Sequence, residues 1–285
     1  MAVYRRGYQR YQGKIEGRLA RFLVLPRFSW KRMFQQRLVV LLLASATIWP
    51  LLCAVFIYIG NNAERINEMR PMQSFLEVND FFFMTFMNTQ KLFAVFLAAL
   101  TGPGLIAPDT ANNALQLYFS RPLTRSDYIL GRLSALMGLL SLITWIPGLA
   151  LFFMQSAMAG NGWGFAHWRL GIGIFTGFML WIFLVALTAL ASSAWVKLRA
   201  IAGGLILGFF FIFSGVSNMV NGVFRGTWGH LLNPSWNVER IVHTLAGMDS
   251  PDGPGIVAAI LAFLAILLLL TFILERKLRP VEVIQ

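Results

Sequence analysis

The chain has 285 residues, of which 57% are hydrophobic and only 13% charged, and its mean hydropathy of +0.65 exceeds that of soluble domains. In a soluble protein the net charge of +12 would suggest nucleic-acid binding, but basic residues of membrane proteins gather on the cytoplasmic side and near anionic lipid, so we expect no nucleic-acid partner. The single cysteine, Cys53, excludes a disulfide within the chain and a cysteine-based metal site.

Residues 1–37 form a basic N-terminal tail. Near its end Trp30, Met33 and Phe34 recur at helical spacing, with cations on the other faces, which predicts a short amphipathic helix on the inner leaflet. We expect Trp30 at the headgroup level and the cations toward anionic lipid. Pro26 is expected to separate this helix from an earlier piece. The alternative is a basic flank that only sets the topology.

Residues 38–285 are predicted to form one transmembrane domain. A helix needs about 20 apolar residues to cross the hydrocarbon core, and six stretches qualify: 38–59, 81–107, 128–153, 170–191, 200–220 and 255–274. Alternation with a period of two residues is absent, which argues against a β-barrel. The predicted fold is therefore an all-α polytopic membrane protein with six transmembrane helices, preceded by the amphipathic helix.

The second stretch, 81–107, is the least regular. A polar run at 88–91 interrupts it and "TGPG" at 101–104 loosens its end, so a re-entrant loop is the competing interpretation. If it is a span, Lys91 is expected to lie toward one interface, where it can snorkel. Charge favours the span: with both termini inside, the inner segments would hold 18 of the 24 Lys and Arg residues.

Two pairs of glycines have the G-x-x-x-G spacing that allows close helix approach, Gly173 with Gly177 and Gly204 with Gly208. Packing within the bundle and dimerisation explain them equally well. Pro50 and Pro147 lie inside spans and are expected to kink their helices.

The outer loop, 221–254, is expected to contain a short external helix, because a Pro-Ser start signal and a glycine at 247 bracket "NPSWNVERIVHTLAG". Trp228 and Trp236 in this loop are expected at the outer membrane interface.

The sequence contains no pattern that predicts catalysis, nucleotide binding or metal binding. It lacks G-x-x-x-x-G-K-[ST], H-E-x-x-H and G-x-S-x-G, and its three histidines fall in predicted outer segments without ligand spacing. Ion-coupled carriers usually keep Asp, Glu or His near the midplane of the membrane, and these spans do not. We therefore expect no catalytic, cofactor-binding or metal-binding residues, and an energy source outside this chain.

The polar segment between the second and third spans is built like a loop with a short helix, and we define it as residues 108–127. Asp109 or Thr110 is expected to cap a helix over 109–119, and Pro122 then ends it, because the residue before proline is pushed out of helical geometry. Thr124 and Asp127 fit the capping box that starts the third span.

Apolar and basic side chains of this loop have two open explanations. Leu115, Tyr118 and Phe119 have no membrane to enter, so they either pack under the bundle or face a cytoplasmic partner. Arg121 and Arg125 either only follow the positive-inside rule or pair with acidic groups of a partner or with lipid phosphates.

The loop resembles that of ABC-2-type permeases, the membrane subunits of one class of ABC transporters. Their pattern reads roughly SRP-[LV]-[ST]-R-x-x-Y-[IL]-L-G-[KR], and residues 120–132 read SRPLTRSDYILGR. Asp109 stands in the family's acidic position, although "TANNA" replaces the Gly-Thr pair that often follows it. The six spans, the basic lead-in and "LLNPSW" before the last span also resemble the family.

The resemblance implies a permease subunit of an ABC transporter, in the bacterial cytoplasmic membrane with both termini in the cytoplasm. Helix 109–119 would be the coupling helix that docks on a separate ATPase subunit, and ATP and Mg would bind only there. Its coupling residues would be Asp109, Leu115, Tyr118, Phe119, Arg121, Pro122 and Arg125.

Further partners implied by the resemblance are a second permease chain, membrane lipid and an extracytoplasmic accessory protein. The uncharged spans and the 25 phenylalanines favour a lipid-like or amphipathic substrate, and export is the commoner direction in the family. The alternative is a membrane scaffold or assembly factor that holds a soluble partner without transport.

Overall fold

The computed structural model describes residues 18–62, 77–112, 124–160 and 162–277, and every regular element in these ranges is helical. The elements, in chain order, are α1 (Arg18–Phe34), α2 (Arg37–Asn62), α3 (Asp80–Thr101), α4 (Pro103–Ala111), α6 (Arg125–Ser141), α7 (Trp145–Ala159), α8 (Trp163–Ala166), α9 (Trp168–Trp195), α10 (Arg199–Phe224), the 3-10 helix η3 (Trp228–Leu232), α11 (Pro234–Ala246) and α12 (Ile256–Lys277).

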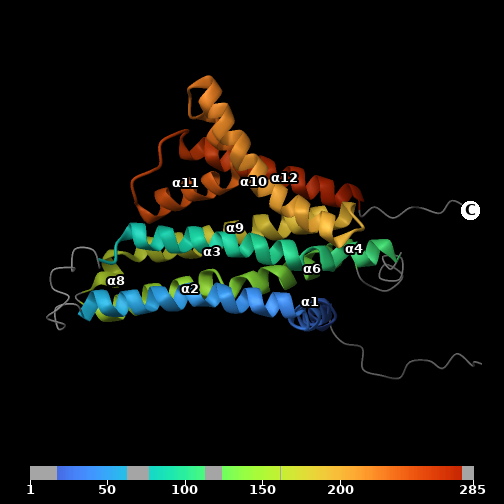
Figure 1. Ribbon diagram of the computed structural model, residues 1–285, viewed down its shortest axis with the longest axis horizontal. Helices are drawn as coiled ribbons and strands as arrows, with labels where there is room; N and C mark the ends of the chain where they lie inside the picture. The colour runs from blue at the N-terminus through green and yellow to red at the C-terminus, as the bar shows by residue number, and fades with distance from the viewer. Residues whose placement is uncertain (1–17, 63–76, 113–123, 161, 278–285) are drawn as a thin grey trace, which may run out of the picture.

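The six predicted spans are all present as helices long and apolar enough to cross a membrane, so the all-helical polytopic fold is confirmed. Most of them run along the long axis of the molecule, whereas α10 runs obliquely to it (Figure 1). One end of the bundle carries α1, α4, the start of α6 and the end of α12, together with Arg125, Arg132, Lys197 and Arg199; we call it the basic end. The other end, with α8 and the start of α3, is called the far end.

Helix α9 is the centre of the bundle, where it packs against α3, α4, α6, α7, α10, α11 and α12. Its sequence is apolar on every side and rich in small residues, which is the composition of a helix that other helices surround. In contrast, α2, α10 and α12 expose most of their apolar surface, as helices on the outside of the bundle do.

The second span consists of α3 and α4, which together are long enough to cross a membrane, and this favours the span over a re-entrant loop. Gly102 joins α3 to α4 in helical geometry, and Pro103 occupies the first turn of α4, where its missing N–H is tolerated. The hydroxyl of Ser193 on α9 accepts hydrogen bonds from the Ile106 and Ala107 N–H groups (3.2 and 2.9 Å) and donates to the Pro103 carbonyl (3.2 Å). Ser193 therefore bonds to the backbone at the start of α4.

The third span is interrupted, as Pro147 predicted. Helix α6 ends at Ser141, three residues form turns, and α7 restarts at Trp145. Pro147 cannot donate to the Ile143 carbonyl and its ring crowds that carbonyl, which accounts for a break just before it. Pro50, in contrast, lies inside an uninterrupted α2.

Two expectations about individual residues are wrong. Helix α1 runs unbroken through Pro26 because Leu25 packs against Gly131 and holds this part of α1 on α6. Lys91 does not snorkel to an interface: it lies midway along α3, only 2% exposed. Its ammonium group donates to the Asn88 side chain (3.1 Å) and lies over the Trp181 ring, so the bundle itself supplies the polar contacts that snorkelling would have provided.

Gly102, where α3 meets α4, gives a direct test of the packing against α9. A Cβ added there would lie 2.6 Å from the Ala189 Cβ, so we expect Gly102→Ala to destabilise the bundle by about 1–3 kcal/mol through overpacking. The loss of helical circular dichroism with increasing SDS measures this. Gly104→Ala is the matched control, since a Cβ there meets nothing within 4 Å and alanine favours the helix. Equal effects of the two substitutions would contradict the assigned contact between α3 and α9.

Candidate functional site

The candidate site lies at the basic end, where the flanks of the loop between the second and third spans come together. The capping box is confirmed: the Thr124 hydroxyl accepts from the Asp127 N–H and the Asp127 carboxylate accepts from the Thr124 N–H, both at 3.2 Å. Leu115, Tyr118, Phe119, Arg121 and Pro122 lie outside the described residues. Arg125 is exposed as the first residue of α6.

The expected start of the loop helix at Asp109 is wrong. Asp109 lies inside α4, which continues the second span and ends at Ala111. The helical geometry of Gly102 lets α4 follow α3 directly, and the Ser193 hydroxyl bonds to the backbone of α4. Asp109 therefore points from the end of a span, and it caps no separate helix.

Asp109 is held by two side chains of α6. The Arg132 guanidinium and the Tyr128 hydroxyl both donate to Asp109 Oδ2, at 2.6 and 2.7 Å. Tyr128 and Arg132 stand four residues apart and so share one face of the helix. The Arg132 guanidinium also lies 5.3 Å from the centre of the Tyr128 ring. These three side chains close the loop by joining the end of α4 to the first two turns of α6.

The cluster extends to α1 through Ser29. Arg132 donates a second hydrogen bond to the Ser29 hydroxyl (2.9 Å), which in turn donates to the Leu25 carbonyl (2.9 Å). We call Asp109, Tyr128, Arg132 and Ser29 the Asp109 cluster. The cluster therefore has members on α1, α4 and α6 and joins these three helices to one another.

Burial makes the two members of this ion pair depend on each other. The side chains of Arg132 and Asp109 are only 10% and 13% exposed. A buried charge that loses its partner is costly, and removal of one member of such a pair typically destabilises a protein by about 3–5 kcal/mol. The pair is therefore a structural requirement of the basic end.

Sequence reasoning named Asp109 but missed its partners. Tyr128 and Arg132 belong to the quoted motif, yet only the distance between spans in three dimensions reveals that they meet Asp109. Their i, i+4 spacing behind a capping box was the available indication. Nothing in the sequence marked Ser29, because its role depends on where α1 crosses α6.

Some of the apolar residues of α1 pack against the protein, and others are exposed. Figure 1 shows α1 nearly end-on, across the direction of the spans. Met33 is buried, and Phe34 is exposed. The Trp30 indole donates to the Ala135 carbonyl (2.7 Å) and its ring lies on Gly138. Trp30 thus anchors α1 to α6 through its indole N–H.

The two G-x-x-x-G pairs have different surroundings. Gly173 and Gly177 on α9 face Ala246 and Val242 on α11, which is close packing within the chain. Gly204 on α10 has nothing within 4 Å of an added Cβ, and Gly208 meets only Ile212 of the same helix. The first pair therefore serves the fold, whereas the second faces open space.

The short helix expected between the fifth and sixth spans is present as α11, with Gly247 as its C-terminal cap, and it packs against α9. Trp236, expected at the outer membrane interface, is only 8% exposed because it packs against Gly253 and stacks on His230. Trp228 is 71% exposed.

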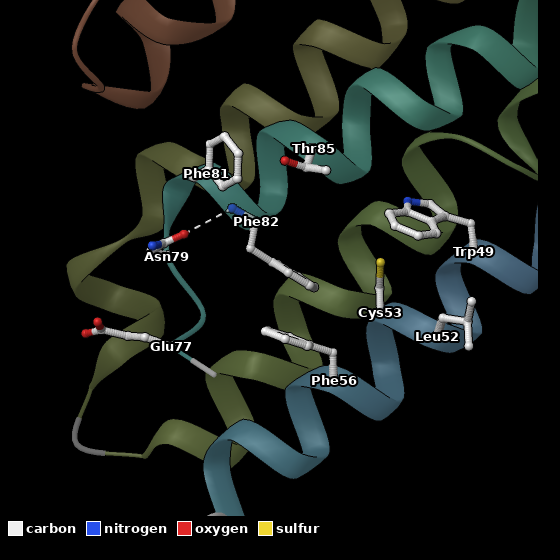
Figure 2. A pocket seen from close by; sticks show the side chains of 9 residues that line it. All are labelled: Trp49, Leu52, Cys53, Phe56, Glu77, Asn79, Phe81, Phe82 and Thr85. Carbon is white, nitrogen blue, oxygen red and sulfur yellow. Dashed lines mark hydrogen bonds between the residues drawn. The ribbon is translucent and has the colours of Figure 1, made fainter. Parts of the chain in front are cut away.

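A hollow of about 410 Å³ lies between α2 and α3 near the far end. Figure 2 shows Trp49, Cys53 and Phe56 of α2 facing Phe82 of α3 across it. The Phe56 and Phe82 rings are stacked at 5.2 Å. The polar residues that line the hollow include Glu77 and Asn79. Asn79 caps α3 and accepts a hydrogen bond from the Phe82 N–H. The hollow is thus mainly apolar and aromatic, with polar groups at one end.

A protein-family model described as ABC-2 family transporter protein matches residues 32–273, which is most of the chain. Curated proteins give no match. The matched range includes Asp109, Tyr128 and Arg132 but begins after Ser29, so the bond from the cluster to α1 lies outside it.

The Asp109 cluster predicts that substitutions of Asp109 and Arg132 have coupled effects on stability. We expect Asp109→Asn and Arg132→Met each to destabilise the solubilised chain by about 3–5 kcal/mol in SDS unfolding, because each leaves a buried charge without its counter-charge. The double variant should lose clearly less than the two single losses together. Arg125→Met, at an exposed position of the same helix, should change stability by less than about 0.5 kcal/mol. Strictly additive losses would show that the two side chains do not depend on each other.

Proposed function

Because the chain belongs to the ABC-2 family of transporter proteins, we propose that ATP hydrolysis on a separate ATPase subunit drives this chain as an export permease. Membership makes the chain a multi-pass membrane subunit of an ABC transporter and not its ATPase. The finer points, which are coupling, orientation, substrate and the second chain, are proposals.

Coupling is supported by the Asp109 cluster. On this proposal residues 113–119 dock on the ATPase through Leu115, Tyr118 and Phe119, flanked by Arg121, Pro122 and Arg125. Movement of the docked segment would pull on both flanks, and the cluster ties those flanks to α4, α6 and α1. A flexible connection between the docked segment and the spans would not transmit the same movement. ATP and Mg would bind only on the partner.

The distribution of charge supports a cytoplasmic basic end. Described cations at that end include Lys31, Arg32, Arg199 and Lys277, whereas the acids Glu77, Asp80, Glu239, Asp249 and Asp252 belong to segments of the far end. Basic residues stay preferentially on the cytoplasmic side of the bacterial membrane. The exposed cations of α1 would then lie near anionic lipid of the inner leaflet.

The hollow between α2 and α3 favours an amphipathic or lipid-like substrate. Its walls are aromatic and aliphatic, and the side chains of Glu77 and Asn79 provide polar contacts at one end (Figure 2). A molecule with an apolar body and a polar head would match both parts. Its position between two spans gives such a molecule a route from the bilayer.

A second permease chain would fit against α10. Gly204, Gly215 and Gly222 leave open space where a Cβ would stand, and the polar Asn218 is exposed between them. Small residues allow close helix approach in membranes, and a polar side chain in hydrocarbon is stabilised by a partner on a neighbouring helix. We propose that a second copy of α10 covers this face.

The decisive test replaces Leu115, Tyr118 and Phe119 together with Ser and measures ATP turnover of the complex purified from native membranes. We expect turnover to fall on the order of tenfold, because apolar anchors carry most of the energy of a docking interface. Phe165→Ser, an exposed apolar position at the far end, should leave it unchanged. Unchanged turnover in the triple variant, or no ATPase in the complex, would favour a scaffold without transport.

The second-chain interface is tested with Gly215→Leu. Since nothing lies within 4 Å of this position, the fold of one chain should tolerate the side chain, while close packing of two copies should not. We expect the dimeric fraction in native mass spectrometry to fall roughly tenfold, equivalent to overpacking of about 1–3 kcal/mol. Gly255→Leu, equally open but outside α10, is the control. An unchanged dimer would place the interface elsewhere.

A further inference from the structure

A second hollow, of about 550 Å³, lies at the basic end between α10 and the junction of α3 and α4. Figure 1 shows that α10 begins beside α4 there. Gln36, in the corner between α1 and α2, also lines this hollow. Its volume falls within the range of about 300–1,000 Å³ that is typical of ligand sites. Neither the proposed coupling nor the proposed substrate hollow uses it.

Glycines give this hollow its shape. A Cβ added to Gly104 of α4 or to Gly204 of α10 would meet nothing within 4 Å, so both glycines leave open space in its walls. Gly203, in contrast, brings two helices together, because a Cβ there would lie 2.7 Å from the Ala99 carbonyl oxygen of α3. The hollow is therefore a groove with a close contact between α10 and α3 at its base, and we call it the α10 groove.

The α10 groove is polar at one end and apolar at the other. Arg199, the first residue of α10, and Gln36 line it at the basic end. Phe96 stands eight residues before Gly104 in the second span, about 12 Å further along the bundle, and Leu207 stands eight residues after Arg199. Phe96 is 39% exposed, so this apolar part faces outward. These properties match the headgroup and the acyl chain of a lipid.

The charge of the groove favours an anionic lipid. Arg199 is exposed, and no described acid forms an ion pair with it. Because Arg199 opens α10, the positive end of the helix dipole adds to its charge. A guanidinium group binds phosphate oxygens through two parallel hydrogen bonds. An anionic phospholipid supplies this phosphate together with a net negative charge, and its chain covers the apolar wall.

We propose that the α10 groove binds one anionic phospholipid, with the phosphate at Arg199 and Gln36 and an acyl chain along Phe96 and Leu207. The bound lipid would join the start of α10 to α4, the helix that carries Asp109. Gly204 also belongs to the α10 face proposed for a second chain, so the lipid would lie at the edge of that interface. Binding requires only that the bundle lies in a membrane, and not that it transports a substrate.

The headgroup is tested by native mass spectrometry of the chain purified from native membranes. It is titrated with phosphatidylglycerol or with phosphatidylcholine of the same acyl chains, and we expect one phosphatidylglycerol to bind the more tightly. Arg199→Gln should weaken phosphatidylglycerol binding on the order of fivefold, as the loss of one cation near anionic lipid predicts. Equal affinity of the parent chain for the two lipids would overturn the proposal.

Lys197→Gln is the matched control for this charge. Lys197 is an exposed cation two residues before Arg199 and does not line the groove, so its substitution should leave the affinity for phosphatidylglycerol unchanged. Equal losses in the two variants would mean that the lipid responds to the general positive charge of the basic end, and that the α10 groove is not its site.

A second variant tests the groove itself. Gly104→Leu keeps every cation and places a side chain in the open space, so phosphatidylglycerol binding should fall on the order of tenfold. Gly255→Leu, equally open but outside the groove, is the control, and helical circular dichroism checks that both variants fold. Unchanged binding in Gly104→Leu would place the lipid elsewhere.

Competition separates a lipid from a free phosphate. Excess inorganic phosphate should not displace the lipid, because it cannot cover the apolar wall of Phe96 and Leu207. Displacement would assign the α10 groove to a free phosphate and overturn the lipid. All these measurements work without ATP or an ATPase, so their failure would leave the proposed transport untouched, and a failure of that proposal would leave their result standing.

Discussion

The ion pair between Asp109 and Arg132 joins the end of one span to the beginning of the next, and the rest of the basic end is organised around it. Without water, a charge at the edge of an apolar bundle requires a partner, and here each supplies the other. The pair fixes where α4 ends relative to α6, Tyr128 adds a second donor to the same carboxylate, and Ser29 extends the contact to α1. The crossing of α1 over α6 follows, with Trp30 and Leu25 packed on glycines of α6.

The same need for internal partners accounts for the irregular points of the spans. Where α3 meets α4 at Gly102, Ser193 bonds to the backbone of α4, and Lys91 is tolerated because it contacts Asn88 and Trp181. Both Ser193 and Trp181 belong to α9, the helix that other helices cover most completely. The central helix therefore provides not only apolar surface but also partners for polar groups of its neighbours.

Features set by local chemistry could be predicted from the sequence. Hydropathy identified all six spans, Pro147 the break in the third, and Thr124 with Asp127 the capping box, because each depends on residues close in the chain. Features set by tertiary contacts could not. Two identical glycine spacings have opposite surroundings, since only one has α11 beside it. The prediction for Pro26 was wrong because packing on α6 outweighs its local preference. The prediction for Lys91 was wrong because partners on α3 and α9 replace contacts at an interface.

The two ends of the bundle are held by different kinds of contact. At the basic end, direct hydrogen bonds of 2.6–2.9 Å join α1, α4 and α6. At the far end, α11 packs closely on glycines of α9, and Arg169 donates to the carbonyls at its C-terminal end. Helix α3 connects the two ends, because it continues into the helix of Asp109 and also carries Lys91, whose ammonium group lies over the Trp181 ring of α9. On the proposed coupling, a displacement that enters through the Asp109 cluster would therefore act on the central helix α9 through α3 and α4.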